Sequence, residues 1–498
     1  MIQIQLNKAD FEYDIHSLVK AFFPSENVSV SAEKKEPDRK ARDAKRSVDA
    51  DPVTARMEIV FANEARRIDV LWQDEAHGVC RVQLPCHSDE RLSVKNDLKI
   101  GLYDMLVRLT GRRLPWGSLT GIRPTKIPMQ LLTQGKGEEE IFSYMKRLYQ
   151  ASDEKIALAI DIARREKALL EKLDYENGYS LYVGIPFCPS TCLYCSFTSY
   201  PIGAWQEKVE DYLDALEREL DFVQARFADK KLNSVYIGGG TPTTLSPGQL
   251  SRLFAMIESR FDFSHLLEYT LEAGRPDSIT REKLLAVRAH PEVDRISVNP
   301  QTMKDETLRV IGRRHTVEQV AERFYLAREL GFSNINMDLI LGLPGETLAD
   351  VEETMRRIQA LHPDNLTVHS LALKRAARLN ICKDEYKDYR MEITPEHGRV
   401  TAAGAAAMGM NPYYLYRQKN MMGNFENVGY GLPGKEGIYN ILIMEEKQTI
   451  VACGAGSVSK RVYPDGRIER SENVKDVAQY IERIGEMIER KKHLLSDC

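Results

Sequence analysis

Three cysteines lie within eight consecutive positions of the chain, at Cys188, Cys192 and Cys195 in the segment CPSTCLYC. The segment follows the apolar run LYVGIPF, which predicts a buried strand, so the three thiolates belong to one compact loop. Three thiolates can bind three irons of a four-iron four-sulfur cluster and leave the fourth iron without a protein ligand. S-adenosylmethionine can chelate that iron through its amino and carboxylate groups, and reduction of its sulfonium releases a 5'-deoxyadenosyl radical. The spacing therefore indicates radical chemistry that begins with hydrogen abstraction.

The alternative interpretation of the same cysteines is a structural zinc site. Structural zinc takes four ligands, commonly as two separated pairs. No second CxxC and no HxxxH pair accompanies the segment. The chain has eight cysteines in all, which is too few for a disulfide framework, and the other five are scattered. The pattern therefore favours an iron–sulfur cluster.

The elements around this loop predict a sheet that positions it. Six short apolar segments recur with helical stretches between them: LYVGIPF, SVYIGGG, YTLEAG, RISVNPQ, INMDLILGLP and LTVHSLAL, beginning at positions 181, 234, 269, 295, 335 and 366. Such runs, alternating with amphipathic helices, predict parallel strands buried on both faces. The fold class is therefore α/β, with six strand–helix units forming a partial, TIM-like (β/α)6 barrel.

Ligands of such barrels bind at the carboxyl ends of the strands. The predicted strands end in residues that suit ligand binding: Cys188, Gly240 and Thr241, Glu272, Gln301, Asp338, and His369 with Ser370. One pocket could therefore collect all of them. His369 is the candidate catalytic residue, for proton transfer or substrate contact, although a single histidine is more often structural.

The patterns outside the core divide the chain into four predicted parts. Residues 1–95 contain alternating segments that predict a small antiparallel sheet within an α+β domain, with a solvated, charge-dense loop at 32–52. Residues 96–175 form a helical connector. Residues 176–375 are the barrel core. Residues 376–498 form a C-terminal α+β extension, in which IYNILIMEE is expected to be a strand and RVYPDGRIE a hairpin.

Charge and hydropathy narrow the classes of partner and compartment. The net charge of −4 gives no global electrostatic footprint for nucleic acid, so such a partner is unlikely. The first residues, MIQIQLNKADFEYD, lack the basic and apolar regions of a secretory signal. No run approaches the roughly 20 apolar residues of a membrane span. We therefore expect a cytoplasmic protein.

The cysteine spacing, with the aromatic Tyr194 before the last cysteine, resembles that of the radical S-adenosylmethionine (SAM) superfamily. The segments GGGTPTTL, LEAGRPDSI, ISVNPQTM, IGRRH and INMDLILGLPGET follow in the order found in the oxygen-independent coproporphyrinogen III oxidase family. This resemblance covers residues 180–375. The long extension before it, with TGIRPTK, is similar to the HemZ branch of that family, which is coproporphyrinogen dehydrogenase-like.

The resemblance implies a four-iron four-sulfur cluster on Cys188, Cys192 and Cys195, with SAM bound beside it. It assigns SAM contacts to Tyr182, Tyr194, Gly239, Gly240, Thr241, Glu272, Gln301, Arg313, Asp338, Ala372 and Val458. The glycine run suits close approach to the methionine amino group, and Arg313 suits a carboxylate. Taken singly, each has a structural alternative: a turn for the glycines, a rim salt bridge for Glu272, and packing for the tyrosines.

The resemblance also implies a substrate. Family members convert propionates of coproporphyrinogen III to vinyl groups in heme biosynthesis, so the expected partners are a tetrapyrrole and an electron donor or acceptor protein. Cations that could bind propionates follow the core, at Arg375, Arg378, Arg417 and Lys419, with solvated surface charge as the alternative.

Two positions depart from the decarboxylating members of the family. Phe197 stands where they carry a fourth cysteine, and Gly184 stands where histidine is common. Their N-terminal, tyrosine-rich substrate segment has no counterpart here. Two further hypotheses therefore stay open. One is a heme-binding chaperone, a branch that also commonly carries phenylalanine after the third cysteine. The other is an RNA-modifying radical enzyme, for which no basic face is evident.

Overall fold

The computed structural model describes residues 1–32, 52–374, 376–418 and 421–496. Most of the charge-dense stretch predicted as a solvated loop lies outside these residues. The chain divides into two compact units: residues 1–160 with 422–425, and residues 161–421 with 426–498. The boundaries of the four parts predicted from the sequence stay predictions. None of the helices described is long and apolar enough to cross a membrane.

The N-terminal unit is built on a five-stranded sheet. Its strands are β1 (Ile2–Leu6), β2 (Val28–Ala32), β3 (Ala55–Ala62), β4 (Arg67–Asp74) and β5 (Gly78–Pro85), in the order β2-β1-β3-β4-β5. The antiparallel pairing of β3, β4 and β5 confirms the small antiparallel sheet predicted from the sequence. Strand β1 pairs in parallel with both neighbours, one of which, β2, the sequence reading missed.

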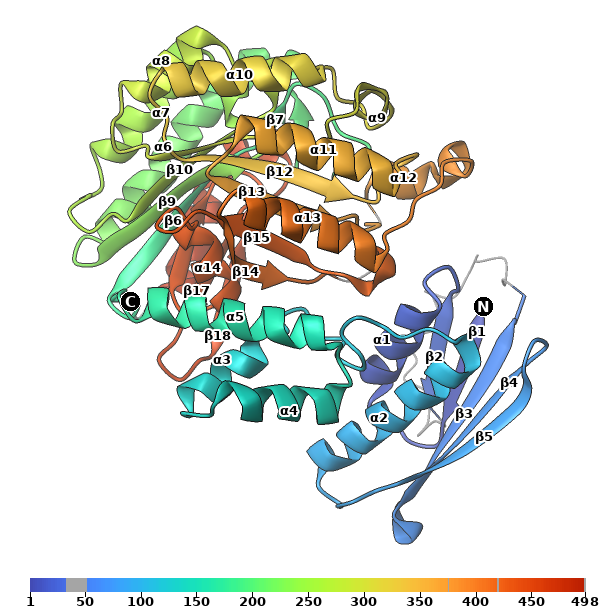
Figure 1. Ribbon diagram of the computed structural model, residues 1–498. Helices are drawn as coiled ribbons and strands as arrows, with labels where there is room; N and C mark the ends of the chain where they lie inside the picture. Colours follow the sequence, from blue (N-terminus) through green and yellow to red (C-terminus); the bar gives the residue numbers. More distant parts are fainter. Residues whose placement is uncertain (33–51, 375, 419–420, 497–498) are drawn as a thin grey trace. The chain divides into compact units, whose positions relative to one another are not determined.

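Helices α1 (Glu12–Phe22) and α2 (Arg91–Thr110) share the core of this unit with the sheet (Figure 1). Alternate residues of the strands, such as Ile4 and Ile59, are buried together with Leu18 and Leu102 of the two helices. The remaining helices of this part of the chain are α3 (Lys126–Thr133), α4 (Glu138–Tyr149) and α5 (Asp153–Leu170). Helix α2 ends at Gly111, which adopts the left-handed conformation common after the last turn of a helix.

The second unit contains six consecutive parallel strands. They are β6 (Gly178–Ile185), β9 (Lys231–Gly239), β10 (Glu268–Gly274), β11 (Arg295–Val298), β12 (Ile335–Leu341) and β13 (Asn365–Ser370). The connecting helices are α6 (Val209–Arg226), α7 (Pro247–Glu258), α8 (Arg281–Arg288), α9 (Asp305–Val310), α10 (Val317–Glu329) and α11 (Leu348–Leu361). This order confirms the predicted α/β class with six strand–helix units.

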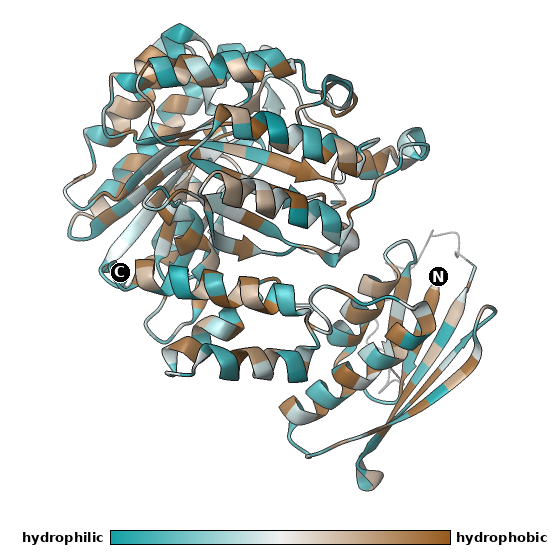
Figure 2. Cartoon of the chain, viewed as in Figure 1, coloured by the Kyte–Doolittle hydropathy of each residue, from teal (hydrophilic) through white to brown (hydrophobic). Residues whose placement is uncertain are grey.

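The two faces of this parallel sheet differ in chemistry. On β6, Leu181 and Val183 are fully buried, and the helices that follow the strands are amphipathic, as Figure 2 shows for α10 and α11. The alternating positions are polar: Ser180, Tyr182, Ser234, Tyr236, Thr270, Glu272, Arg295, Ser297, Asn336, Asp338, Asn365, Thr367 and His369. The six strands are buried on both faces, as the sequence predicted, although one of the two buried faces is polar.

The C-terminal segment adds strands to both edges of the same sheet. Its elements are α12 (Arg378–Ile381), α13 (Pro395–Ala407), β14 (Asn411–Tyr416), β15 (Asn427–Gly431), α14 (Ile438–Glu445), β16 (Thr449–Cys453), β17 (Val458–Val462), β18 (Ile468–Glu472), α15 (Val477–Glu482) and α16 (Ile484–Leu494). Strand β15 pairs antiparallel with β13, and β16 pairs parallel with β6. The resulting order is β14-β15-β13-β12-β11-β10-β9-β6-β16-β17-β18.

One predicted strand of this segment is a helix, and one predicted hairpin is confirmed. The run IYNILIMEE forms α14, since a short apolar run fits a buried helix as well as a strand. Strands β17 and β18 pair antiparallel across the PDG turn.

A buried ion pair joins the end of the chain to the sheet. Lys491 of α16 donates to Glu219 of α6, and both side chains are inaccessible to solvent. Glu219 also accepts from the amide of Gly454 at 2.7 Å and from the Tyr480 hydroxyl at 2.6 Å. Because Gly454 follows β16, this network holds the β16–β17 loop beside α6.

Candidate active site

The cysteine loop leaves the sheet at the carboxyl end of β6. Cys188 belongs to the short strand β7 (Phe187–Cys188), which pairs with β8 (Tyr200–Pro201). Main-chain bonds fix both sides of the loop. The amide of Thr241 donates to the Phe187 carbonyl at 2.7 Å, and the amide of Leu193 donates to the Ile311 carbonyl at 2.9 Å. The loop is therefore held between the glycine run after β9 and the segment after α9.

Close approach explains the glycine run. A Cβ at position 240 would lie 2.5 Å from the Phe187 carbonyl oxygen and 2.9 Å from the Ile185 carbonyl oxygen. Gly239 has a φ of 104°, a conformation that side chains other than hydrogen rarely allow. These two glycines let β9 approach the start of the cysteine loop, which any larger residue would displace.

The three thiols are free and largely buried. Cys188 and Cys192 are 9% and 8% exposed, and Cys195 is half-buried. Burial raises the pKa of the Cys188 thiol to about 11, although a contact of 3.5 Å with the Thr241 hydroxyl opposes this shift. Burial also raises the pKa of Cys195. Binding of iron would deprotonate such thiols, because the metal binds the thiolate form.

Two buried arginines face the middle cysteine. The Arg275 guanidinium lies 3.7 Å from the Cys192 sulfur and also donates to the Ser190 carbonyl at 2.9 Å. Asp277 holds Arg275 through two hydrogen bonds, of 3.0 and 2.7 Å. Arg313 donates to the Asn299 carbonyl at 2.6 Å, and its charge acts on Tyr194 and Cys192. A positive environment of this kind fits thiolates bound to iron.

Arg275 and Asp277 were not among the residues selected from the sequence. Both stand in LEAGRPDSI, the segment that carries Glu272, so the motif pointed to their neighbourhood. The Arg275 side chain, however, contacts the cysteine loop more than 80 positions earlier in the chain, and Asp277 holds Arg275 in place; only the fold creates this contact.

A stack of tyrosines and one carboxyl lie on the polar face. Tyr236 stacks on Tyr439 of α14 with ring centroids 4.4 Å apart, and Tyr182 lies 6.1 Å from Tyr236 in a parallel orientation. The Tyr236 hydroxyl donates to the Glu272 carboxyl. Burial raises the pKa of Glu272 to about 7, opposed by the Tyr236 bond and assisted by the Asp338 charge. Glu272 can therefore accept or release a proton near neutral pH.

The next three strands, β11, β12 and β13, bring Gln301, Asp338 and His369 together. Gln301 has a φ of 70°, and its amide donates to the Asp338 carbonyl at 2.9 Å. The Asp338 carboxylate accepts from Asn336 at 2.8 Å and is the charge that acts on His369. Burial lowers the pKa of His369 more than Asp338 raises it. A left-handed, non-glycine residue such as Gln301 is uncommon and is often found at functional sites.

The other predicted residues differ in their placement. Ala372 forms an isolated antiparallel bridge with Met421. Val458 begins β17 and is 40% exposed, unlike every other residue of the predicted SAM set. Arg378 is exposed in α12, whereas Arg417 is 6% exposed and burial lowers its pKa to about 10. Arg375 and Lys419 lie outside the described residues.

The donor set fits an iron–sulfur cluster. Three free thiols share one anchored loop, and a buried guanidinium points at one of the sulfurs. Within the described part of the chain, no group of three or more His, Cys, Asp or Glu side chains is arranged around a single metal ion. A cubane differs from a single ion in that each thiolate binds a separate iron.

The comparisons with known proteins agree with this fold and loop. Residues 182–358 match the model of the radical SAM superfamily. The chain is 42% identical to the oxygen-independent coproporphyrinogen-III oxidase-like protein HemZ of Bacillus subtilis over 80% of both chains. It is 32% identical to the heme chaperone HemW of the same organism, over 62% of this chain and 76% of the relative. Among solved structures, the coproporphyrinogen III oxidase HemN of Escherichia coli is similar, with a TM-score of 0.50 and 25% identity over 65% of this chain and 73% of that one.

The parallel sheet and the cysteine loop at its carboxyl edge define a radical SAM protein. Its cofactors are therefore a four-iron four-sulfur cluster and S-adenosylmethionine. Within that superfamily the chain belongs to the family of oxygen-independent coproporphyrinogen-III oxidase-like proteins.

Proposed function

We propose that this protein is a radical SAM oxidoreductase that converts propionate side chains of coproporphyrinogen III to vinyl groups in heme biosynthesis. The observation that carries the proposal is the extent of the similarity to HemZ: 42% identity over 80% of both chains. The superfamily match covers only residues 182–358, so the similarity to HemZ extends well beyond the part that all radical SAM proteins share.

The cluster and SAM, when bound, supply the 5'-deoxyadenosyl radical that starts the reaction. For each propionate, one hydrogen atom leaves the side chain, carbon dioxide is released, and one electron passes to an external acceptor as the vinyl group forms. The chain must therefore work with an electron donor for the cluster and an acceptor for the substrate electron.

The proposed ligands of the cluster are the three loop cysteines, and the proposed SAM contacts lie around them. Gly239, Gly240 and Thr241 are proposed to offer main-chain groups to the methionine amino group, since the two glycines carry no side chain that would keep a ligand away. The raised pKa of Glu272 suits a carboxyl that exchanges its Tyr236 bond for ribose hydroxyls or an ammonium group. Arg313 is proposed to bind the methionine carboxylate.

The substrate contacts are proposed on the C-terminal side of the parallel sheet. Arg378 is exposed and available for a propionate, and Arg417 is a buried cation that an anionic side chain would stabilise. His369 is proposed to transfer a proton or contact the substrate. Burial holds it neutral, and a neutral imidazole can act as either donor or acceptor.

An anaerobic assay tests the proposal. Reconstituted protein is incubated with SAM, a reductant, an electron acceptor and coproporphyrinogen III, and the products are separated by chromatography. We expect 5'-deoxyadenosine and protoporphyrinogen to form together. Cys192→Ala should lose bound iron and both products, whereas Cys80→Ala, in β5 of the N-terminal unit, should retain them. Formation of 5'-deoxyadenosine without any porphyrin product would reject this substrate and keep the radical chemistry.

A second candidate is a heme chaperone, favoured by the similarity to HemW and by Phe197. Phe197 is 77% exposed and stands where decarboxylating members carry a fourth cysteine. A chaperone would bind heme through an accessible axial ligand and leave coproporphyrinogen unchanged. A Soret band that appears on titration with heme, in protein that gives no protoporphyrinogen, would favour this candidate over the first.

A further inference from the structure

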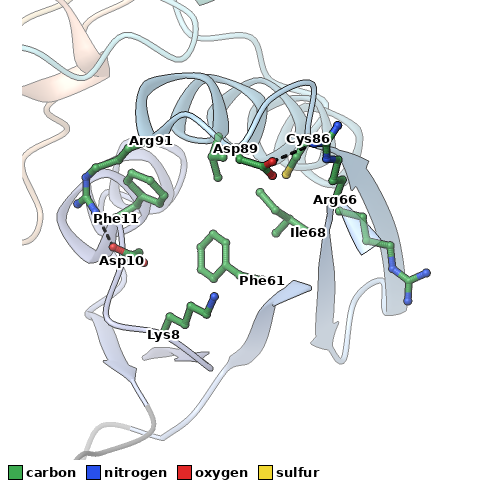
Figure 3. Close-up of a pocket in the computed structure, with 11 residues that line it drawn as sticks. Lys8, Asp10, Phe11, Phe61, Arg66, Ile68, Cys86, Asp89 and Arg91 are labelled. Atoms are coloured by element: carbon green, nitrogen blue, oxygen red, sulfur yellow. Dashed lines mark hydrogen bonds and ion pairs between the residues drawn. The ribbon is translucent and has the colours of Figure 1, made fainter. Parts of the chain in front are cut away.

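A pocket of about 200 Å³ lies in the N-terminal unit, outside the residues that match the radical SAM superfamily (Figure 3). It is formed where the chain enters α1, where β3 turns into β4, and where the chain enters α2. What this pocket binds does not depend on the function proposed for the cysteine loop.

The floor of the pocket is apolar and partly aromatic. Phe61 of β3 lies between Phe11 and Ile68 in Figure 3. The rings of Phe11 and Phe61 are 6.0 Å apart between centroids and tilted by 52°, so they form two sides of a corner rather than a closed stack. A corner of this kind can take one flat ring by edge-to-face or offset contact.

Cations surround this floor. Arg91 lies 4.8 Å from the centre of the Phe11 ring and bonds to Asp10 at 2.7 Å. Arg66 bonds to Asp89 at 3.0 Å. Both ion pairs are largely exposed, and exposed pairs contribute little, so the arginines can exchange these partners for an anionic ligand.

Lys8 also lines the pocket, and it is the cation without a partner. Its side chain has neither an ion-pair nor a hydrogen-bond partner among the residues that the structure describes. With Arg66, Arg67 and Arg91 it gives four cations against two carboxylates, Asp10 and Asp89, in the lining. The lining is therefore positively charged.

The pocket lies beside the cap residue of α1, Phe11, and the first turn of α2, which contributes Arg91 and Val94. The cap residues, Phe11 of α1 and Glu90 of α2, make no side-chain hydrogen bond to the helix they begin. The free amides and positive end of an uncapped helix attract anions. Acidic side chains partly offset this effect at both helices: Glu12 and Asp14 in the first turn of α1, and the cap residue Glu90 at α2.

The backbone of the lining is strained at two positions. Phe11 has a φ of 59° and Arg66 a φ of 45°. Left-handed conformations of bulky residues cost free energy and persist where the surrounding structure imposes them, often at ligand sites. Two of the seven non-glycine residues with positive φ in the described part of the chain thus line this single pocket.

We infer that the pocket binds a small aromatic anion, with its ring in the corner between Phe11 and Phe61 and its carboxylate or phosphate held by Lys8, Arg66 and Arg91. At about 200 Å³ the pocket is smaller than the sites that enclose drug-sized ligands, so it takes one ring and excludes a tetrapyrrole. The ring and the anion are both required, because each contacts a different part of the lining.

Binding to the full, cluster-loaded chain tests this inference by saturation-transfer NMR and calorimetry. Phenyl phosphate and benzoate are the probes, and they distinguish an aromatic phosphate from an aromatic carboxylate. Two controls each carry only one of the two required groups: inorganic phosphate has the anion without the ring, and benzyl alcohol has the ring without the anion. We expect at least one probe to bind at least tenfold more tightly than both of these.

Variants locate the binding. Lys8→Met and Arg91→Met should each lower the affinity for the probe several-fold. Arg81→Met should not, because Arg81 is an exposed cation of β5 outside the lining. All three are surface substitutions and should leave the fold intact, which circular dichroism checks. Probes that bind no better than phosphate or benzyl alcohol, or equally in Lys8→Met and Arg81→Met, would overturn the inference.

Discussion

The guanidinium of Arg275 should set the reduction potential of the cluster. Its nitrogen lies 3.7 Å from the Cys192 sulfur, the side chain is 3% exposed, and Asp277 fixes it by two hydrogen bonds. Arg275→Met removes the positive charge and keeps most of the length of the side chain. Arg281→Met is the matched control, since Arg281 is half exposed and pairs with Glu329 on the surface.

The expected shift follows from the charge on the cluster. A cation stabilises the reduced, more negative cluster more than the oxidised one, so losing it lowers the potential. A hydrogen bond to a charged group contributes about 1.5–3 kcal/mol, and one added charge should change that contribution by about 1–2 kcal/mol. For a one-electron couple, where a tenfold change in equilibrium is 59 mV, the potential should fall by roughly 40–90 mV.

The reduction potential is measured in anaerobic, reconstituted protein by a redox titration that is monitored by electron paramagnetic resonance. Arg275→Lys should give an intermediate reduction potential, because it keeps the positive charge but loses the pair of hydrogen bonds to Asp277. The double variant Arg275→Met/Asp277→Asn removes the carboxylate that the single variant leaves without its partner. A reduction potential that is unchanged in Arg275→Met and in the double variant, with iron and sulfide content equal to the wild type, would refute the reasoning.

Three further perturbations test the positioning of the site and the fold. Gly240→Ala should lower the free energy of unfolding by about 1–3 kcal/mol and reduce bound iron, because its Cβ would lie 2.5 Å from a carbonyl oxygen. The control is Gly248→Ala, whose Cβ meets open space, and equal iron content in the two variants would contradict this prediction. Glu272 has its pKa raised from 4.5 to about 7 by burial, so its contribution to stability is complete below about pH 4.5 and is lost as the pH rises through about 7. Infrared spectra should show its protonated carboxyl at pH 6 and lose that band in Glu272→Gln, and a band already absent at pH 6 would argue against the shift. Lys491→Met should destabilise the protein by about 3–5 kcal/mol, because it leaves a buried carboxylate unpaired. Lys492→Met, on the exposed side of the same helix, should destabilise it by under about 1 kcal/mol. Equal shifts of the unfolding temperature in calorimetry would contradict this difference.

Local patterns predicted the frame of the site. The fold class, the six parallel strands and the two cofactors follow from the cysteine spacing and from apolar runs that alternate with helices, and all three predictions are confirmed. The individual SAM contacts stay predictions. The fold nevertheless gathers several of them near the cysteine loop or near Asp338, and Val458 is the exposed exception.

Contacts between distant segments were beyond the reach of those patterns. The polar face of the sheet was overlooked because Tyr182, Tyr236 and Glu272 interrupt their strands singly, and each alone is compatible with packing. The run of α14 was misjudged because its apolar residues suit either a buried helix or a strand. The ion pair of Glu219 and Lys491 joins residues more than 250 positions apart, so no local sequence pattern could predict it.

The sequence by itself was enough to predict which residues would bind the cluster, because three thiols within eight positions meet whenever their loop folds. It also determined the order of strands and helices, since each depends on its own periodicity. Tertiary structure alone decided which charges act on those thiols: Arg275, held by Asp277, and Arg313 reach the cysteine loop from other strand–helix units. Electrostatic and hydrogen-bonding effects depend on distance in space, and only packing of the sheet brings these groups within range of Cys192.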